Sequence, residues 1–276
     1  LSRDDLLAFH RDWLQPDKAR IVIVGDTTLK QVMPLLEKHF GDWKAPANAP
    51  QLPAVTAVAR PRAPRVFLVD QPGAIQSNIY VGQVVAPTGD ASSIDFDFAN
   101  GVLGGEFSSR LNMNLREDKH WAYGSYSGAS NTLGQRPWIA SAAVQSDKTV
   151  ESMRELKREI EDFASGRKSP TTAEVGKIRA SNTLSLPGGY ETSAAVMTQI
   201  LSNLRYGRPD DYLVRYKARN EAMTPVLAQT AAKAIDPSAL TWVVVGDLSK
   251  IEQPIRALKL GEAQVLDADG NPVARK

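Results

Sequence analysis

The sequence contains no cysteine, only three histidines and no long apolar run. Without cysteine, disulfides, thiolate nucleophiles, Cys-ligated zinc and iron–sulfur clusters are excluded. No apolar run reaches the ~18 residues of a spanning helix, so no membrane span is expected. The charges nearly balance, with 33 Lys and Arg against 31 Asp and Glu. This balance argues against a nucleic-acid partner, which usually requires a strongly basic surface.

The remaining composition is that of a globular protein. The chain has 276 residues, of which 42% are hydrophobic and 23% charged, enough for one large domain or two smaller ones. It begins at Leu1 without an initiating Met. We therefore expect it to be a piece of a longer protein.

An internal repeat is the most informative feature. The segment Pro16–Asp26 reads PDKARIVIVGD, and Pro237–Asp247 reads PSALTWVVVGD, at an offset of 221 residues. Each copy follows a helical pattern and precedes another one, at 29–40 and 249–258. A helix–strand–helix unit thus closes a module of about 220 residues and recurs at the end of the next.

The repeat and a biased segment divide the chain into three parts. Residues 46–64 include five Pro and six Ala, a composition that favours an extended linker. Residues 1–45 are predicted to be the C-terminal tail of a preceding homologous module, with Ile21–Val24 as a strand separated from its sheet. Residues 65–276 are predicted to form a complete second module.

The second module has the pattern of an α+β fold. Strands are predicted at 66–69, 76–85, 121–132, 137–145 and in the second copy of the repeat, and helices at 92–103, from Ser108 or Ser109 to Arg116, at about 150–163, from 170, at 191–206, at 210–223 and on either side of the repeat strand. Because most strands come in hairpin pairs, we expect an antiparallel sheet with the helices grouped on one face.

Most catalytic patterns are absent. Zinc hydrolysis needs two ligands one helical turn apart, as in H-x-x-E-H, and this motif does not occur. Glu117 and His120 are three residues apart, but no second histidine lies nearby. No metal ligand and no catalytic residue is therefore predicted in this chain. Ser108 and Ser109 are expected to be helix caps rather than nucleophiles, since no G-x-S-x-G elbow surrounds them.

One pair of residues could bind a ligand. Arg116 is expected near a helix end, and Tyr123 follows seven residues later in the next strand. A short loop could bring the guanidinium and phenol donors to one cleft, where they would hold a carbonyl or carboxylate. The alternative is that Arg116 only complements the helix dipole or pairs with Glu117 or Asp118.

The segment Gly104–Gly124, GGEFSSRLNMNLREDKHWAYG, closely resembles the signature of the insulinase (pitrilysin) family of zinc metallopeptidases, which includes the mitochondrial processing peptidases. The repeat resembles the closing element of that family's homologous modules. In the family, a zinc-bearing module and a zinc-lacking module face each other as two halves of a clam. The resemblance identifies residues 65–276 as the zinc-lacking half, and it implies that Arg116 and Tyr123 bind the substrate backbone.

The resemblance implies a non-catalytic, substrate-binding portion of a zinc metalloendopeptidase. Zinc would lie in a homologous half, either upstream or in a partner chain, and extended peptide would be the substrate. An alternative is a degenerate structural or assembly subunit without protease activity. A free-standing peptide-binding module is a third possibility. The final residues, VLDADGNPVARK, resemble the tails of bacterial periplasmic members, which implies a periplasmic location.

Overall fold

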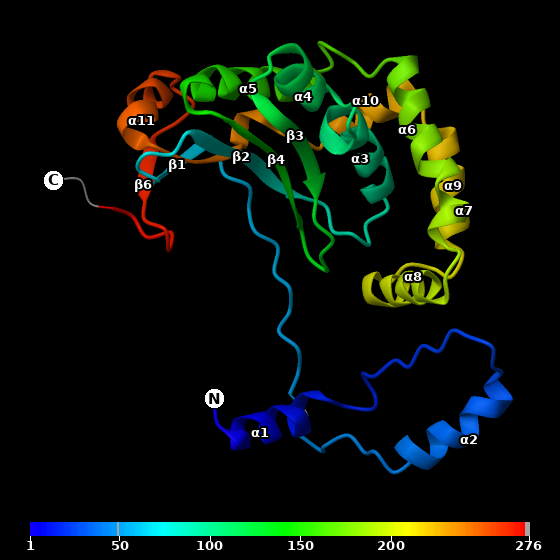
Figure 1. Ribbon diagram of the computed structural model, residues 1–276. Helices are drawn as coiled ribbons and strands as arrows, with labels where there is room; N and C mark the ends of the chain where they lie inside the picture. Colours follow the sequence, from blue (N-terminus) through cyan, green and yellow to red (C-terminus); the bar gives the residue numbers. More distant parts are fainter. Residues whose placement is uncertain (49, 274–276) are drawn as a thin grey trace. The chain divides into compact units, whose positions relative to one another are not determined.

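The computed structural model describes residues 1–48 and 50–273 (Figure 1). Ala49 of the predicted linker and residues 274–276 of the tail lie outside the described residues. The chain divides into two compact units. The first comprises Leu1–Thr56 with Leu186–Asp210, and the second comprises Ala57–Ser185 with Asp211–Lys276.

The first unit is helical. Its helices are α1 (Arg3–Trp13), α2 (Leu29–Phe40), α7 (Leu186–Gly189) and α8 (Ser193–Tyr206). Helices α1 and α2 each begin with a capping box, in which a hydroxyl residue and the residue three positions later hydrogen-bond each other's backbone. No residue of α1 or α2 is buried. These two helices are therefore locally well specified, but they bury no apolar core.

The structure differs from the sequence prediction at Ile21–Val24. These residues are assigned neither helix nor strand, and Ile21 and Ile23 are 53% and 49% exposed. A strand is defined by its ladder of hydrogen bonds, and within the described residues this segment has no neighbouring strand to pair with. The second copy of the repeat has such neighbours, and there Thr241–Gly246 forms strand β5.

The second unit contains a six-stranded sheet and the remaining helices. Its strands are β1 (Arg65–Asp70), β2 (Gln76–Val85), β3 (Ala122–Ala129), β4 (Arg136–Gln145), β5 and β6 (Ala263–Leu266). Its α-helices are α3 (Ser93–Asn100), α4 (Arg110–Asn112), α5 (Thr149–Ser165), α6 (Thr172–Leu184), α9 (Tyr212–Ala222), α10 (Pro225–Ala232) and α11 (Leu248–Ala257). None of the described helices is long and apolar enough to cross a membrane.

The strands are ordered β3-β4-β2-β5-β1-β6. The pairs β3–β4, β4–β2 and β2–β5 are antiparallel, as expected. The pairs β5–β1 and β1–β6 are parallel, so the sheet is mixed rather than wholly antiparallel. The predicted α+β class is confirmed, and so are the helices on one face, with α3, α5, α10 and α11 lying over the same side of the sheet (Figure 1).

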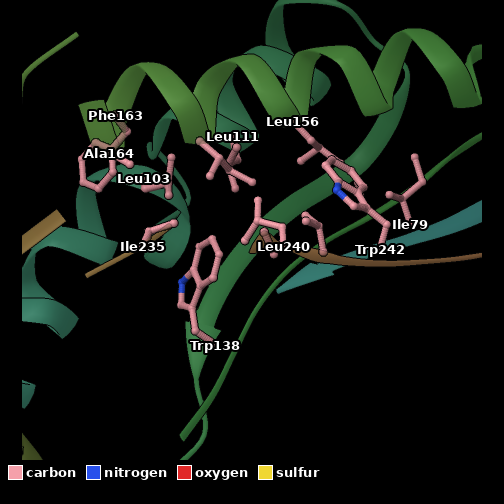
Figure 2. Packing of buried hydrophobic residues seen from close by; sticks show 14 of the residues in the cluster. Ile79, Leu103, Leu111, Trp138, Leu156, Phe163, Ala164, Ile235, Leu240 and Trp242 are labelled. Atoms are coloured by element: carbon pink, nitrogen blue, oxygen red, sulfur yellow. The ribbon is translucent and has the colours of Figure 1, made fainter. Parts of the chain in front are cut away.

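The core lies between this face and the helices. Strand β2 alternates buried and more exposed residues, as a sheet with one covered face requires. Trp138 of β4 and Trp242 of β5 point from the sheet toward α5, where Leu156 lies beside Trp242, and Phe163 lies farther along the same layer next to Ala164 (Figure 2). The two tryptophans, Leu156 and Phe163 are at most 2% exposed. The opposite face is more open, with Tyr80 and Ile139 42% and 44% exposed.

The Gly-Asp pair that ends each repeat has a structural role in the second copy. A Cβ on Gly246 would lie 2.6 Å from the Ser77 hydroxyl and 2.9 Å from the Ile251 side chain, so any larger residue would force these neighbours to shift. Asp247 begins α11: its carboxylate accepts hydrogen bonds from the backbone N–H of Ser249 at 3.2 Å and of Gly73 at 3.3 Å. In the first copy, nothing lies within 4 Å of a Cβ placed on Gly25. The same sequence is thus packed in one copy and open in the other.

Replacing Asp247 by alanine should lower the melting temperature near pH 7. Hydrogen bonds from Ser249 and Lys250 lower the pKa of Asp247 to about 2, below the ~3.9 of an unfolded aspartate. Because the folded-state pKa is the lower one, the stabilisation is fully present above about pH 4 and is lost as the pH falls toward about 2.

Melting curves from about pH 7 to pH 2 on the wild type, Asp247→Ala and Asp26→Ala would check this expectation. Asp26 is the matched control, since it occupies the equivalent position in the unpacked copy and is exposed. Equal melting of the two variants at pH 7 would contradict the capping role.

Candidate functional site

The segment between α3 and β3 is an irregular helix that lies directly against the sheet. It consists of a π-helical turn at Gly101–Gly105, the short helix α4, and a second π-helical turn at Met113–Asp118. A Cβ on Gly104 would lie 2.6 Å from the backbone nitrogen of Ser127. Glycine therefore permits a close approach between the helical backbone and β3.

A buried amide joins the start of this segment to β3 and β4. The Asn100 Oδ1 atom accepts hydrogen bonds from the Ser127 hydroxyl at 2.6 Å and from the Trp138 indole N–H at 2.7 Å. Its Nδ2 atom donates to the Ser127 carbonyl at 2.8 Å. Satisfying these polar groups avoids the cost of burying them unpaired.

The first arginine of the segment is structural. The Arg110 guanidinium makes two hydrogen bonds to the Glu174 carboxylate, at 2.7 and 2.9 Å, and also donates to the carbonyls of Lys168 and Ser169. Burial raises the pKa of Glu174, but hydrogen bonds from Arg110 and Thr171 outweigh it and leave the pKa below its usual value. Arg110 thus ties α4 to the beginning of α6.

The second arginine of the segment, Arg116, has a different environment. The Arg116 side chain is 35% exposed, and its nearest carboxylate is Glu117, whose Oε1 lies 3.3 Å from Nη1. That Nη1 atom is buried and has no hydrogen-bond partner among the described residues. The guanidinium lies over the Phe107 ring, 4.5 Å from its centroid, in cation–π geometry.

Tyr123 lies near the start of β3, within an irregularity of the strand. The pairing of β3 with β4 shifts between Ala122 and Ser125, and Tyr123 is 89% exposed. Because β3 forms one edge of the sheet, this phenol is presented at a sheet edge rather than within it.

Arg116 and Tyr123 line one cavity of about 470 Å³. Its other lining residues are Gln76, Glu117, His120, Trp121, Ala122 and Gln145. The two predicted site residues therefore line the same cavity. Gln76 and Gln145 were not among the predicted site residues. They lie far from the signature segment and reach the cavity only because β2, β4 and the segment meet at one end of the sheet.

His120 supports the turn between the two site residues. It has a positive φ of 57°, an uncommon conformation for a residue other than glycine. Its Nδ1 atom lies 3.0 Å from the Arg116 carbonyl, and because a carbonyl only accepts, Nδ1 is the donor. Glu117 and His120 line the same cavity, yet no group of three or more potential metal ligands occurs in the described part of the chain.

The two arginines should respond differently to mutation. Arg110→Ala removes two charged hydrogen bonds from a largely buried pair, and should lower the free energy of unfolding by about 2 kcal/mol. Arg116→Ala removes a half-exposed ion pair and should cost less than about 1 kcal/mol. Denaturant unfolding of both variants tests the contrast. A larger loss in Arg116→Ala than in Arg110→Ala would show that Arg116 is the structural residue.

Comparison with known proteins supports the family resemblance of the signature segment. Residues 1–182 match the family model described as the peptidase M16 inactive domain. An uncharacterized zinc protease of Mycobacterium bovis is 26% identical over 209 residues, covering 75% of this chain and 47% of that protein. The chain thus spans about half the length of this curated relative.

Solved structures share the fold. The peptidase M16 inactive domain from Pseudomonas fluorescens superposes with a TM-score of 0.78 at 18% identity, covering 89% of this chain and 58% of that one. A protease from Helicobacter pylori gives a TM-score of 0.79 at 20% identity, covering 89% and 59%. Together with the family match over residues 1–182, this likeness confirms the resemblance found in the signature: the chain belongs to the peptidase M16 inactive-domain family of zinc protease-like proteins.

Proposed function

We propose that this chain is the non-catalytic, substrate-binding portion of a zinc metalloendopeptidase, and that Arg116 and Tyr123 bind the peptide backbone. The observation that carries the proposal is that these two side chains line one cavity. The ion pair of Arg116 with Glu117 is partly exposed and Tyr123 is 89% exposed, so neither side chain makes a largely buried ion pair of the kind that Arg110 makes.

The chemistry of the pair suits a peptide carbonyl. During peptide hydrolysis, negative charge develops on the carbonyl oxygen, and fixed donors aimed at that oxygen lower the barrier. Arg116 offers guanidinium N–H groups from a side chain that is 35% exposed. Tyr123 offers a hydroxyl from the edge strand. An extended peptide paired along this sheet edge would bring its backbone past both donors.

The zinc belongs, in this proposal, to a homologous half outside this chain. The residues here do not fit zinc, since Glu117 and His120 have no third partner in the described residues. The M. bovis relative is about twice as long as the segment matched here, which leaves room for such a half upstream in the same chain. The alternative is that a partner chain supplies it.

We further propose that residues 1–45 are the tail of a preceding homologous module, joined through the linker 46–64 to the module at 65–276. The exposed Ile21 and Ile23 and the open space around Gly25 support this division. Each of these positions corresponds to a packed one in the second copy of the repeat. A periplasmic location is proposed on the resemblance of the C-terminal tail at 265–276.

In the full-length protein combined with its zinc-bearing half, Arg116→Ala and Tyr123→Phe should each lower kcat/KM for a peptide about a hundred- to thousandfold. This is the usual effect of losing one donor to a developing oxyanion. Melting temperatures should change little, because both side chains are at least partly exposed. Lys217→Ala, on an exposed helical ion pair of α9, is a control for general surface effects.

Peptide-cleavage kinetics and melting curves on the same samples measure both quantities. Wild-type turnover in both variants, or a collapse of the fold in either, would overturn the proposed role. A full-length protein that cleaves no peptide at all would instead favour the structural or assembly subunit.

The chain alone should bind no stoichiometric zinc and cleave no peptide, since a stable zinc site needs three or four protein ligands in fixed geometry. Metal analysis of the purified chain, after a chelator wash and dialysis against zinc, measures the content per molecule. One tightly held zinc per chain would contradict the assignment of the metal to another half.

A further inference from the structure

We propose that Asn112 is a positioning residue that holds Arg116 and Tyr123 in a common register at the cavity. The inference rests on the proposed role of those two residues. It assigns no contact with substrate to Asn112. Its basis is a pair of hydrogen bonds from one buried side chain, one toward each member of the site.

Asn112 is an unusual residue for its place. It is the last residue of α4, and it is 0% exposed. An asparagine side chain buried this deeply needs partners for both its donor and its acceptor atoms. Both partners are backbone groups: the carbonyl of Phe107, in a turn, and the N–H of Ser125, in the edge strand β3.

The first hydrogen bond leads to Arg116. The Asn112 Nδ2 atom donates to the Phe107 carbonyl at 2.6 Å. The Phe107 ring lies beneath the Arg116 guanidinium at 4.5 Å, although the residue is 57% exposed. Since Phe107 lies outside regular secondary structure, this bond fixes the backbone that carries the ring. The ring in turn restricts the guanidinium.

The second hydrogen bond leads to Tyr123. The Asn112 Oδ1 atom accepts from the backbone N–H of Ser125 at 3.2 Å. Ser125 ends the irregularity of β3, in which Tyr123 and Gly124 are not paired with β4. The bond therefore anchors the strand from the core side, immediately after the unpaired residues. Without this hydrogen bond, Tyr123 and Gly124 could shift along the edge of the sheet.

Loss of this side chain should misplace the donors without removing them. A displacement of about 1 Å at a reacting centre can lower the rate about a hundredfold. The expected effect of Asn112→Ala in the full-length protein with its zinc half is therefore a roughly 10- to 100-fold fall in kcat, with KM little changed.

Asn220 provides a matched control. It is also 0% exposed, and its amide makes two hydrogen bonds, donating to the Tyr216 carbonyl at 2.8 Å and accepting from Asn182 at 2.7 Å. It lies in α9, and it is not among the residues that line the cavity. Asn220→Ala should lose comparable stability but keep kcat. An equal fall in kcat in both variants would reduce Asn112 to a structural residue.

A double-mutant cycle tests whether Asn112 acts through Arg116. If it does, the variant carrying both Asn112→Ala and Arg116→Ala should be at most about threefold slower than the slower single variant. Multiplication of the two effects would overturn the proposal on the Arg116 side. Wild-type kcat in Arg116→Ala would instead overturn the proposed function. Hydrogen exchange of the Ser125 amide then tests the role of Asn112 independently of activity.

Hydrogen exchange reports positioning without any activity. Asn112→Ala should speed exchange of the Ser125 amide, whereas Asn220→Ala should leave it unchanged. Unchanged Ser125 exchange in a folded Asn112→Ala protein would refute the anchoring of β3. Should Asn112→Ala fail to fold, Phe107→Leu keeps the Arg116 side testable. Phe107 is largely exposed, so this variant should fold and still lower kcat, and wild-type kcat in it would contradict the proposal.

Discussion

The site depends on the direct contact between a helical backbone and the edge strand β3. This contact requires that Gly104 have no side chain, because a Cβ there would collide with Ser127. It also requires partners for polar groups that the close approach buries, and Asn100 and Asn112 supply them. Once the helical segment is fixed in this way, Arg116 at its end and Tyr123 at the start of β3 must share one cavity.

The segment contains two arginines, Arg110 and Arg116, whose surroundings differ. Arg110 is largely buried, and hydrogen bonds to Glu174 and to two carbonyls engage its donors. Arg116 is stacked on an aromatic ring and lines an open cavity. Two residues of the same type, six positions apart, thus make different contacts.

Sequence patterns anticipated the elements with strong local signals. The strand predicted at 76–85 coincides with β2, and the Gly-Asp repeat marked β5. The parallel edge of the sheet was missed because β6 is only four residues long and pairs with a strand almost 200 residues away. At Ile21–Val24 a strand was predicted that did not form. Strand propensity alone was not enough, because the described residues offered no pairing partner.

At the site, the spacing of Arg116 and Tyr123 was visible in the sequence, but their support was not. Asn112 resembles an ordinary helical residue until the structure places its amide between Phe107 and Ser125. Gln145 likewise reaches the cavity through strand order, which no local pattern encodes. The most direct test of the whole account is a structure of the full-length protein, with its zinc half, bound to a slowly cleaved peptide. It should show a peptide carbonyl oxygen about 3 Å from donors of both Arg116 and Tyr123; a bound peptide whose backbone touches neither residue would contradict the account.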